Sequence, residues 1–460
     1  MFTSSIEIMS SSTQQTLSIA PMIQWTDTNW RYLFRHITRK TLLYTEMTMD
    51  GTLLHQRNDL KRFLGHTRVE HPLVLQLGGS DPALMSEAGY IAESFAQYHS
   101  ININCGCPST KAKKAGFGAE LMLDPDNTAE IVRALKRKVT HTDITVKCRL
   151  GILPDHDSYE ELQHFITSVH QAGADSIIMH ARNCILTGLT PAQNRSIPPL
   201  RYDLVHRLVA EYPDIDFYLN GGLTSFEQCE MHMGIGLESD STDDVTTVFN
   251  SLSLSEEQRA MCKTHPVKGC MVGRQAYKDP WMFATADSRF FNSTDPGISR
   301  GQALNNYIDY CQVLCDSSSN QTSCHDVPDS IDGGVIQAVD ALATLTVNDK
   351  DTSDDDSDRD LLQIDRAYEP KMGNYFNYSE NLKPLHNFFN GCPGGSTAYK
   401  RKLDALCVEA TRRRKAINSS ETGKESGRMN PEEQFEVFQD IMRDSLEGTI
   451  SNEFLEEIPC

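Results

Sequence analysis

The chain has 460 residues and 13 cysteines, and this length suffices for one large α/β domain with a smaller second domain. The cysteines lack the paired spacing of a disulfide framework or a zinc site, and no apolar run has the length of a membrane span. We therefore expect a cytoplasmic protein without metal or membrane, with an organelle as the open alternative. The net charge is −20, yet residues 233–262, 317–360 and 418–460 together carry −22, so the remaining chain is near +2 and does not exclude RNA.

Eight short apolar runs follow an N-terminal segment, residues 1–16, that we expect to be disordered. The runs are residues 17–22, 42–47, 72–77, 101–104, 144–148, 176–180, 216–220 and 268–273, and each ends in a polar or glycine-containing cluster. Segments with helical periodicity lie between the runs, with start signals such as Asp81-Pro82 and Asp126. This alternation predicts a (β/α)8 barrel, or TIM barrel; a doubly wound parallel sheet is the alternative.

On such a barrel the polar clusters share one face, formed by the carboxyl ends of the strands. The turns after the seventh and eighth strands commonly bind phosphate, and here they contain Gly221, Gly222, Gly273 and Arg274. The barrel therefore predicts an anion site at these two turns.

Cys107 lies in a tight turn just after the fourth apolar run, between Gly106 and Pro108. Glycine limits crowding before the thiol and proline fixes the backbone after it, so the thiol can be aimed. A cysteine thiol is mostly protonated at neutral pH and can act as a proton donor as readily as a nucleophile. The alternative is a turn that merely contains cysteine.

The domain boundaries follow from composition. We expect the barrel over residues 17–295, interrupted by an acidic insertion at 233–267. A helical domain is predicted over 296–417, with an acidic disordered insertion at 316–364, followed by an acidic and weakly helical tail at 418–460. Residues 398–417 form a strongly basic helical segment, for which composition alone favours a solvated face over a phosphate contact.

Nine motifs in order resemble those of the flavin-dependent tRNA-dihydrouridine synthases, most closely the bacterial A-type branch. They read APMIQWTDTNWR, LLYTEM, LVLQLGGSDP, INCGCPS, GFGAELM, TVKCRLG, HARNCILTGLTPAQNR, NGG and GRQAY. The resemblance covers residues 17–291 and resumes over 383–406, but it omits both acidic insertions and the tail.

The resemblance implies an FMN-binding barrel, NADPH as reductant, and reduction of the C5–C6 double bond of uridine at positions 20 and 20a of tRNA. Hydride would pass from flavin N5 to C6 while Cys107 protonates C5. An enzyme reaches a base in folded RNA by extruding it, so the uridine must be turned out onto the flavin. The helical domain would bind tRNA, and we expect a monomer.

The resemblance also implies roles for individual residues. The flavin contacts would be Ala20, Pro21 and Met22 under the ring, Gln76 at its polar edge, Lys147 and His180. The FMN phosphate would be bound by Asn220, Gly221, Gly222, Gly273 and Arg274. The tRNA contacts would be Asn104 and Arg182 at the uracil, Asn183, Thr187, Asn194 and Arg195 on the sixth βα loop, and Lys400 and Arg401 on the basic helix. Cys105 replaces an expected aliphatic residue, so a second thiol could compete with Cys107 or protect it.

Two other functions fit parts of this pattern. An FMN barrel reductase of a small pyrimidine or enone would need no basic helical domain. A flavin-free RNA-binding module would tolerate the loss of Cys107.

Overall fold

The computed structural model of the chain describes residues 16–235, 256–320, 381–390, 396–420, 431–447, 449–450 and 455. These residues form two compact units. The first contains the described residues up to Arg31, Thr38–Gly65 and Glu70–Pro296, and the second contains Tyr32–Ile37, His66–Val69 and the described residues from Gly297 onward. Of residues 1–16, which we expected to be disordered, 1–15 lie outside the described residues and Thr16 instead begins the first strand. Most of both predicted insertions also lies outside the described residues.

Eight parallel strands form the sheet of the first unit. They are β1 (Thr16–Ile19), β2 (Leu43–Met49), β3 (Leu73–Gly78), β4 (Ser100–Cys105), β5 (Asp143–Cys148), β7 (Ser176–His180), β9 (Phe217–Asn220) and β10 (Gly269–Val272), in the sheet order β1-β10-β9-β7-β5-β4-β3-β2. The two edges meet, because the Ile19 N–H donates to the Leu42 carbonyl at 2.9 Å and the Leu42 N–H donates to the Leu17 carbonyl at 3.0 Å. The predicted (β/α)8 barrel is therefore confirmed.

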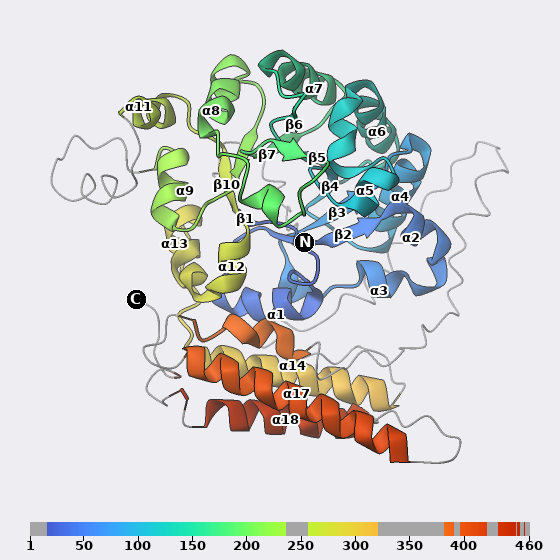
Figure 1. Cartoon of the computed structure of the whole chain (residues 1–460), viewed down its shortest axis with the longest axis vertical. Helices are drawn as coiled ribbons and strands as arrows, with labels where there is room; N and C mark the ends of the chain where they lie inside the picture. Colours follow the sequence, from blue (N-terminus) through green and yellow to red (C-terminus); the bar gives the residue numbers. More distant parts are fainter. Residues whose placement is uncertain are drawn as a thin grey trace, which may run out of the picture. The chain divides into compact units, whose positions relative to one another are not determined.

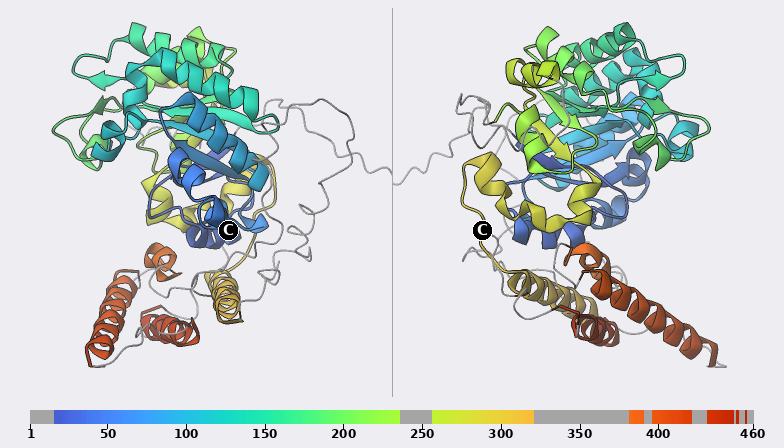
Figure 2. Two further views of the ribbon diagram at one scale, coloured as in Figure 1. Left: turned by 90° about the vertical axis from the view of Figure 1, so that its right-hand side faces the viewer. Right: turned by 60° about the vertical axis from the view of Figure 1, so that its left-hand side comes forward.

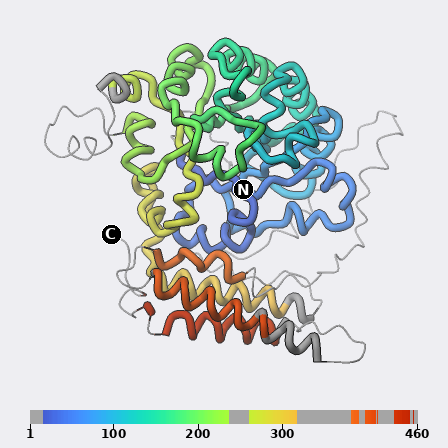
Figure 3. The backbone as a smooth tube through the Cα atoms, viewed as in Figure 1, coloured from blue at the N-terminus to red at the C-terminus, as the bar shows by residue number. Residues whose placement is uncertain are grey.

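Helices surround this barrel, as Figure 1 shows. They are α1 (Thr28–Ile37), whose second half is grouped with the second unit, α2 (Asp50–His55), α3 (Leu60–Leu64), α4 (Pro82–Phe95), α5 (Thr110–Lys114), α6 (Pro125–Lys138), α7 (Tyr159–Gln171), α8 (Tyr202–Glu211), α9 (Phe226–His232), α11 (Glu256–Thr264), α12 (Arg274–Lys278) and α13 (Ala286–Phe291). Figure 3 lets the described chain be followed around them. A two-stranded sheet, β6 (Ile152–Leu153) with β8 (Cys184–Ile185), lies in the βα loops.

Side-chain caps set where several of these helices begin. Asp81 accepts the Leu84 N–H at 2.9 Å at the start of α4, and the following proline suits the first helical position. The same arrangement starts α6, where Asp124 accepts the Asn127 N–H at 3.0 Å. This start lies slightly before the predicted signal at Asp126, because Asp124 provides the cap.

The barrel interior changes character along the strands. An apolar cluster contains Ala20, Leu42, Tyr44, Val74, Ile178 and Met271. Two residues beyond Val74 on β3, Gln76 is also buried and belongs to a polar group with Asn102 and Thr145. The apolar cluster stabilises the barrel, and the polar group supports the face at the carboxyl ends of the strands.

The second unit contains three long helices: α14 (Arg300–Asn320), α17 (Ser396–Ser420) and α18 (Pro431–Leu446). Helix α18 contacts both α14 and α17 (Figure 2). We expected an insertion from residue 316 and a tail from residue 418; instead, α14 continues to Asn320 and α18 is part of the unit. Helix α18 belongs to the unit because its apolar side chains are buried: Phe438 and Met442 lie in the interior although the surrounding composition is acidic. In the described part of the chain, no helix has the length and apolarity needed to cross a bilayer.

Candidate active site

The Cys107 turn is held by the last part of strand β4. The Asn104 carboxamide oxygen accepts the N–H groups of Gly106 at 3.1 Å and of Cys107 at 3.0 Å. The Cys107 thiol is partly exposed and donates to the Ser109 hydroxyl at 3.4 Å. Ser109 in turn caps helix α5 by accepting the Ala112 N–H. The turn thus presents one thiol on the face where the strands end, as predicted for Cys107.

Gly118, the first residue of the 3₁₀ helix Gly118–Leu123, packs directly against Cys107. A Cβ atom on Gly118 would lie 2.6 Å from the Cys107 carbonyl oxygen, and the φ angle of Gly118 is +71°. The next N–H group, of Ala119, donates to that carbonyl oxygen at 3.0 Å. Only glycine fits this position, both for its left-handed backbone and for its close approach.

Cys105 has a different environment from Cys107, because it is the last residue of strand β4 and Cys107 lies in the turn that follows. Its side chain is completely buried, and burial raises the pKa of the thiol well above its usual value. The strand therefore keeps Cys105 protonated and away from solvent, while Cys107, two residues later, lies in the turn.

A chain of amides links β3, β4 and β5 inside the barrel. The Asn104 side-chain nitrogen donates to the Gln76 oxygen at 2.8 Å, and the Gln76 nitrogen donates to the Asn102 oxygen at 2.8 Å. Asn102 then donates to the Thr145 hydroxyl at 2.9 Å. These bonds fix the orientation of Gln76 and Asn104 together. Asn104, predicted at the uracil edge, therefore also positions the Cys107 turn.

Lys147 and Asn220 meet across the same interior. The Lys147 ammonium donates to the Asn220 carboxamide oxygen at 3.0 Å, and the Asn220 nitrogen donates to the Met271 carbonyl at 2.8 Å. Burial, and then the nearby Arg149 charge, lowers the pKa of Lys147 to about 8. Among the described residues no carboxylate neutralises this ammonium, so it is suited to an anionic or electron-rich ligand.

His180 lies against the glycine turn after β9. A Cβ atom on Gly221 would come within 2.7 Å of the His180 ring, and one on Gly222 would lie 2.9 Å from the Tyr202 hydroxyl oxygen. That hydroxyl donates to the Gly221 carbonyl at 2.7 Å. Burial lowers the pKa of His180 well below its usual value, and the charges of Arg149 and Lys147 lower it further, so the imidazole is neutral.

Arg149 joins two loops of this face and was missed by the sequence reasoning. Its side chain is 2 % exposed. Its guanidinium donates to the backbone carbonyls of Gly106 at 3.0 Å, Asn183 at 3.2 Å and Asn194 at 3.0 Å. It therefore holds the Cys107 turn against the sixth βα loop. The only sequence signal was an arginine directly after a strand, in the motif TVKCRLG.

Three further arginines lie near the glycine turns, and within the described ranges none of them has an acidic partner. Arg274 donates to the Arg195 carbonyl at 3.2 Å, and Arg182 donates to the Pro198 carbonyl. Burial lowers the pKa of both Arg182 and Arg195, and Arg274 lowers it further in each. The buried Nε atoms of Arg182 and Arg195 have no hydrogen-bond partner among the described residues. Mutually repelling cations with unused donors are typical of an anion site.

The predicted tRNA contacts do not all lie in comparable environments. Thr187, Lys400 and Arg401 are exposed, and the last two belong to α17 of the second unit. Asn194, in contrast, is completely buried, with its carboxamide bonded to the Ile185 N–H at 2.8 Å and to the Ile185 carbonyl at 2.9 Å. Asn194 therefore shapes the sixth βα loop, and the prediction of a direct tRNA contact does not fit its burial.

The residues predicted to lie under the flavin ring, Ala20, Pro21 and Met22, follow the end of β1 on this face. Ala20 is buried in the interior cluster and Met22 packs against that cluster. The Ala20 N–H donates to the Val272 carbonyl at 2.8 Å, so the segment that contains Ala20, Pro21 and Met22 continues the barrel wall beside Gly273. The structure thus places the predicted cofactor residues and Cys107 on the same face of the barrel, at the carboxyl ends of the strands. This face is called the rim below.

Comparison with known proteins places this rim in a family. A family model described as dihydrouridine synthase (Dus) matches residues 18–238. A tRNA-dihydrouridine(20/20a) synthase of Pseudomonas putida is 42 % identical over 287 residues, which cover 62 % of this chain and 75 % of that protein. The protein of the same name from Synechocystis is 38 % identical over 307 residues, covering 66 % and 81 %. A solved structure titled "Crystal structure of TcOYE with pHBA" covers 60 % of this chain and 89 % of its own at 10 % identity, with a TM-score of 0.38, too low to add to the strand pairing. The chain belongs to the dihydrouridine synthase family of oxidoreductases.

Proposed function

We propose that this protein binds FMN and uses NADPH to reduce uridine to 5,6-dihydrouridine at positions 20 and 20a of tRNA. The observation that carries the proposal is the partly exposed Cys107 thiol, held on the same rim as Lys147 and the unpaired arginine donors. The relatives named tRNA-dihydrouridine(20/20a) synthase support the substrate and the two positions.

The residues of the rim fit FMN. Its phosphate needs backbone N–H groups and cations. The turn at Gly221 and Gly222 lies near Arg182 and Arg195, whose Nε donors have no partner in the part of the chain that the structure describes. Ala20, Pro21 and Met22 would support the ring, and Gln76 and His180 would contact its edge. Lys147 would lie where negative charge gathers on a reduced flavin, at N1 and the C2 carbonyl.

When bound, FMN supplies the hydride that adds to C6 of the uracil and is reduced again by NADPH. Cys107 supplies the other hydrogen: the S–H bond breaks, a C–H bond forms at C5, and the thiolate regains a proton from solvent. Asn104 and Arg149 keep the backbone of the Cys107 turn fixed during this transfer, through their bonds to Gly106 and Cys107.

The substrate must reach this rim as an extruded base, because the C5–C6 bond of a stacked uridine is inaccessible. We assign Arg182 and Asn104 to the uracil, Asn183, Thr187 and Arg195 to the surrounding RNA, and Lys400 and Arg401 to its phosphates. A monomer located in the cytoplasm is part of the same proposal.

The test is the dihydrouridine content of unmodified tRNA after incubation with the protein, FMN and NADPH, measured by mass spectrometry. We expect position 20 or 20a to gain two hydrogens. Cys107→Ala should lose most of this activity while retaining bound flavin. Cys105→Ala is the matched control, because it removes the buried thiol at the end of β4, two residues before Cys107, and should remain active.

Other results would favour the two alternatives. A flavin-bound protein that reduces a small pyrimidine or an enone, but leaves tRNA unchanged, would favour the small-substrate reductase. A colourless protein that binds tRNA and tolerates Cys107→Ala would favour the RNA-binding module.

A further inference from the structure

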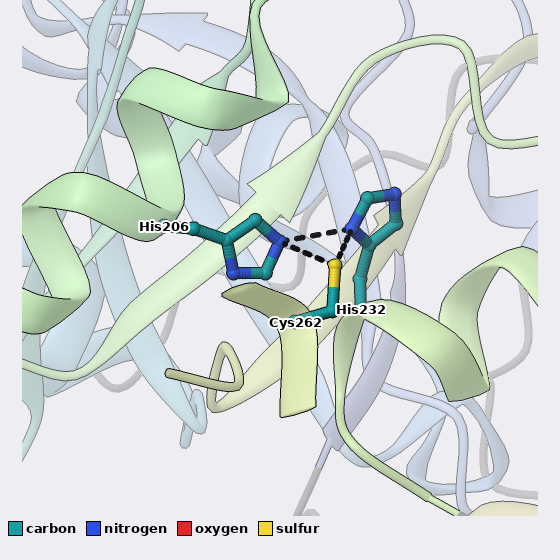
Figure 4. Close-up of side chains that lie close together, drawn as sticks. All are labelled: His206, His232 and Cys262. Atoms are coloured by element: carbon teal, nitrogen blue, oxygen red, sulfur yellow. Dashed lines mark hydrogen bonds between the residues drawn. The ribbon is translucent and has the colours of Figure 1, made fainter. Parts of the chain in front are cut away.

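Two histidines and a cysteine meet in the helical layer of the first unit (Figure 4). His206 comes from α8, His232 from the end of α9 and Cys262 from α11, and each side chain is 2 % exposed. His206 Nε2 lies 3.0 Å from His232 Nδ1, and the Cys262 sulfur lies 3.3 Å from the former and 3.5 Å from the latter. Within the described part of the chain, this is the one such group of potential metal ligands.

These distances match those between the ligands of a tetrahedral metal ion. Zinc binds imidazole nitrogen at about 2.0–2.1 Å and thiolate sulfur at about 2.3 Å, which puts two nitrogens about 3.3 Å apart and a nitrogen and a sulfur about 3.6 Å apart. The observed separations are shorter by only a few tenths of an ångström. An ion therefore fits with a small outward movement of the three side chains.

The orientation of His206 supports ligation. Its Nδ1 lies 2.8 Å from the backbone carbonyl of His265. Because a carbonyl only accepts, Nδ1 carries the hydrogen and Nε2 directs its lone pair toward His232 and Cys262. A ring nitrogen fixed by such a backbone bond is the usual second contact of a metal-binding histidine.

We propose that His206, His232 and Cys262 bind one Zn²⁺ ion, with water in the fourth position. On binding, the Cys262 S–H bond breaks, the proton leaves to solvent and a sulfur–zinc bond forms, with no change of oxidation state. The ion ties α11, which follows residues 236–255 in the chain, to α8 and α9, and its role is structural because the site is closed to substrate. This inference departs from the sequence-based expectation of no metal, since ligands 26 and 30 residues apart on three helices match no motif.

The first test is the metal content of the full chain, purified under reducing conditions without chelator and measured by plasma mass spectrometry. We expect about one zinc per chain in the wild type, in line with a single site. Cys262→Ala and His206→Asn should lose it. Cys315→Ser is the matched control, because Cys315 is equally buried but belongs to the second unit.

A cobalt titration keeps the proposal testable if a variant fails to fold. Metal-free, reduced wild-type protein should develop the thiolate-to-cobalt charge-transfer band and the intense visible bands of tetrahedral Co²⁺. A zinc-free preparation that shows neither band would overturn the proposal and leave a hydrogen-bonded trio of core side chains. Equal bands in folded Cys262→Ala would also overturn it, because another thiol would then hold the ion.

Discussion

Arg149 is a buried side chain that bonds the backbone of the Cys107 turn to the sixth βα loop. Arg149→Met keeps the length of the side chain but loses the bonds to the carbonyls of Gly106, Asn183 and Asn194. We expect dihydrouridine formation to fall by roughly 100-fold, the effect of moving a reacting group by about 1 Å. Flavin content should stay near that of the wild type. The measurement is single-turnover reduction of tRNA by the prereduced enzyme.

The control for this prediction is Arg133→Met, which removes an exposed arginine of α6 that pairs with Glu130. Its turnover should match the wild type. Wild-type turnover in folded Arg149→Met would show that the Cys107 turn keeps its geometry without the hydrogen bonds from Arg149.

Lys147 gives the flavin-free protein a defined pH dependence. Its pKa is about 8 in the folded protein, against an ordinary value of 10.5. Between these values the unfolded chain binds more protons, so the folded state gains stability as pH rises. We therefore expect the free energy of unfolding of Lys147→Met to exceed that of the wild type by the largest amount below pH 8. This difference should shrink by at most about 3 kcal/mol between pH 8 and pH 10.5.

Denaturant unfolding of both proteins at a series of pH values measures this difference. Lys114→Met, an exposed lysine in α5, shows the effect of losing one surface charge. A difference between Lys147→Met and wild type that stays constant over this range would contradict the lowered pKa.

Motifs named most of the rim residues, but they gave no contacts. Gln76, Lys147 and Asn220 are polar residues near the carboxyl ends of apolar runs, a position that sequence patterns show well. Arg149 and Asn194 could not be assigned in this way, because their roles depend on carbonyls and N–H groups from other loops. An arginine that holds three carbonyls and an arginine that faces RNA look the same in a sequence.

At the level of elements, the loop from Cys107 to Gly118 makes a steric prediction. Gly118 and Gly188 both have positive φ angles, +71° and +84°. A Cβ atom meets the Cys107 carbonyl only at Gly118; at Gly188 nothing lies within 4 Å. Gly188→Ala should therefore lose only about 1 kcal/mol of stability to backbone strain. Gly118→Ala should lose a further 1–3 kcal/mol, roughly the cost of overpacking.

Chemical denaturation of the two variants tests this prediction. Equal losses of stability would mean that the Cys107 turn moves aside at no cost, and that the close packing of Gly118 against Cys107 does not require glycine.

The eight strands were predictable because parallel strands buried on both faces appear as short apolar runs bounded by glycine and polar residues. Helix α18 was not, because its buried aromatic side chains lie within an acidic composition that predicts a tail. The cap of α6 was displaced by two residues, since aspartates at 124 and 126 both suit a helix start and only the structure shows which one bonds.

For the whole molecule, the unequal distribution of charge predicts where salt acts. If Lys400 and Arg401 contact tRNA phosphates, Lys400→Glu/Arg401→Glu should weaken tRNA binding and reduce the dependence of log affinity on log salt by roughly one to two. The rate at which NADPH reduces the enzyme-bound flavin in the absence of tRNA should not change. Binding isotherms at several salt concentrations provide the measurement.

Arg133→Glu/Arg137→Glu makes the same charge change on one exposed helix, α6. An equal loss of affinity and slope in this control would show that tRNA responds to total charge, not to α17.

The distribution of thiols has a consequence for survival under oxidative stress. Of the described cysteines, only Cys107 and Cys407 are partly exposed, and the others are buried. Peroxide attacks accessible sulfur first, and a sulfenic acid at Cys107 has no S–H hydrogen to give. If Cys107 is the proton donor, oxidant exposure would stop the reaction at this one sulfur atom and leave the fold intact. Any thiol that reduces Cys107 would restore the activity.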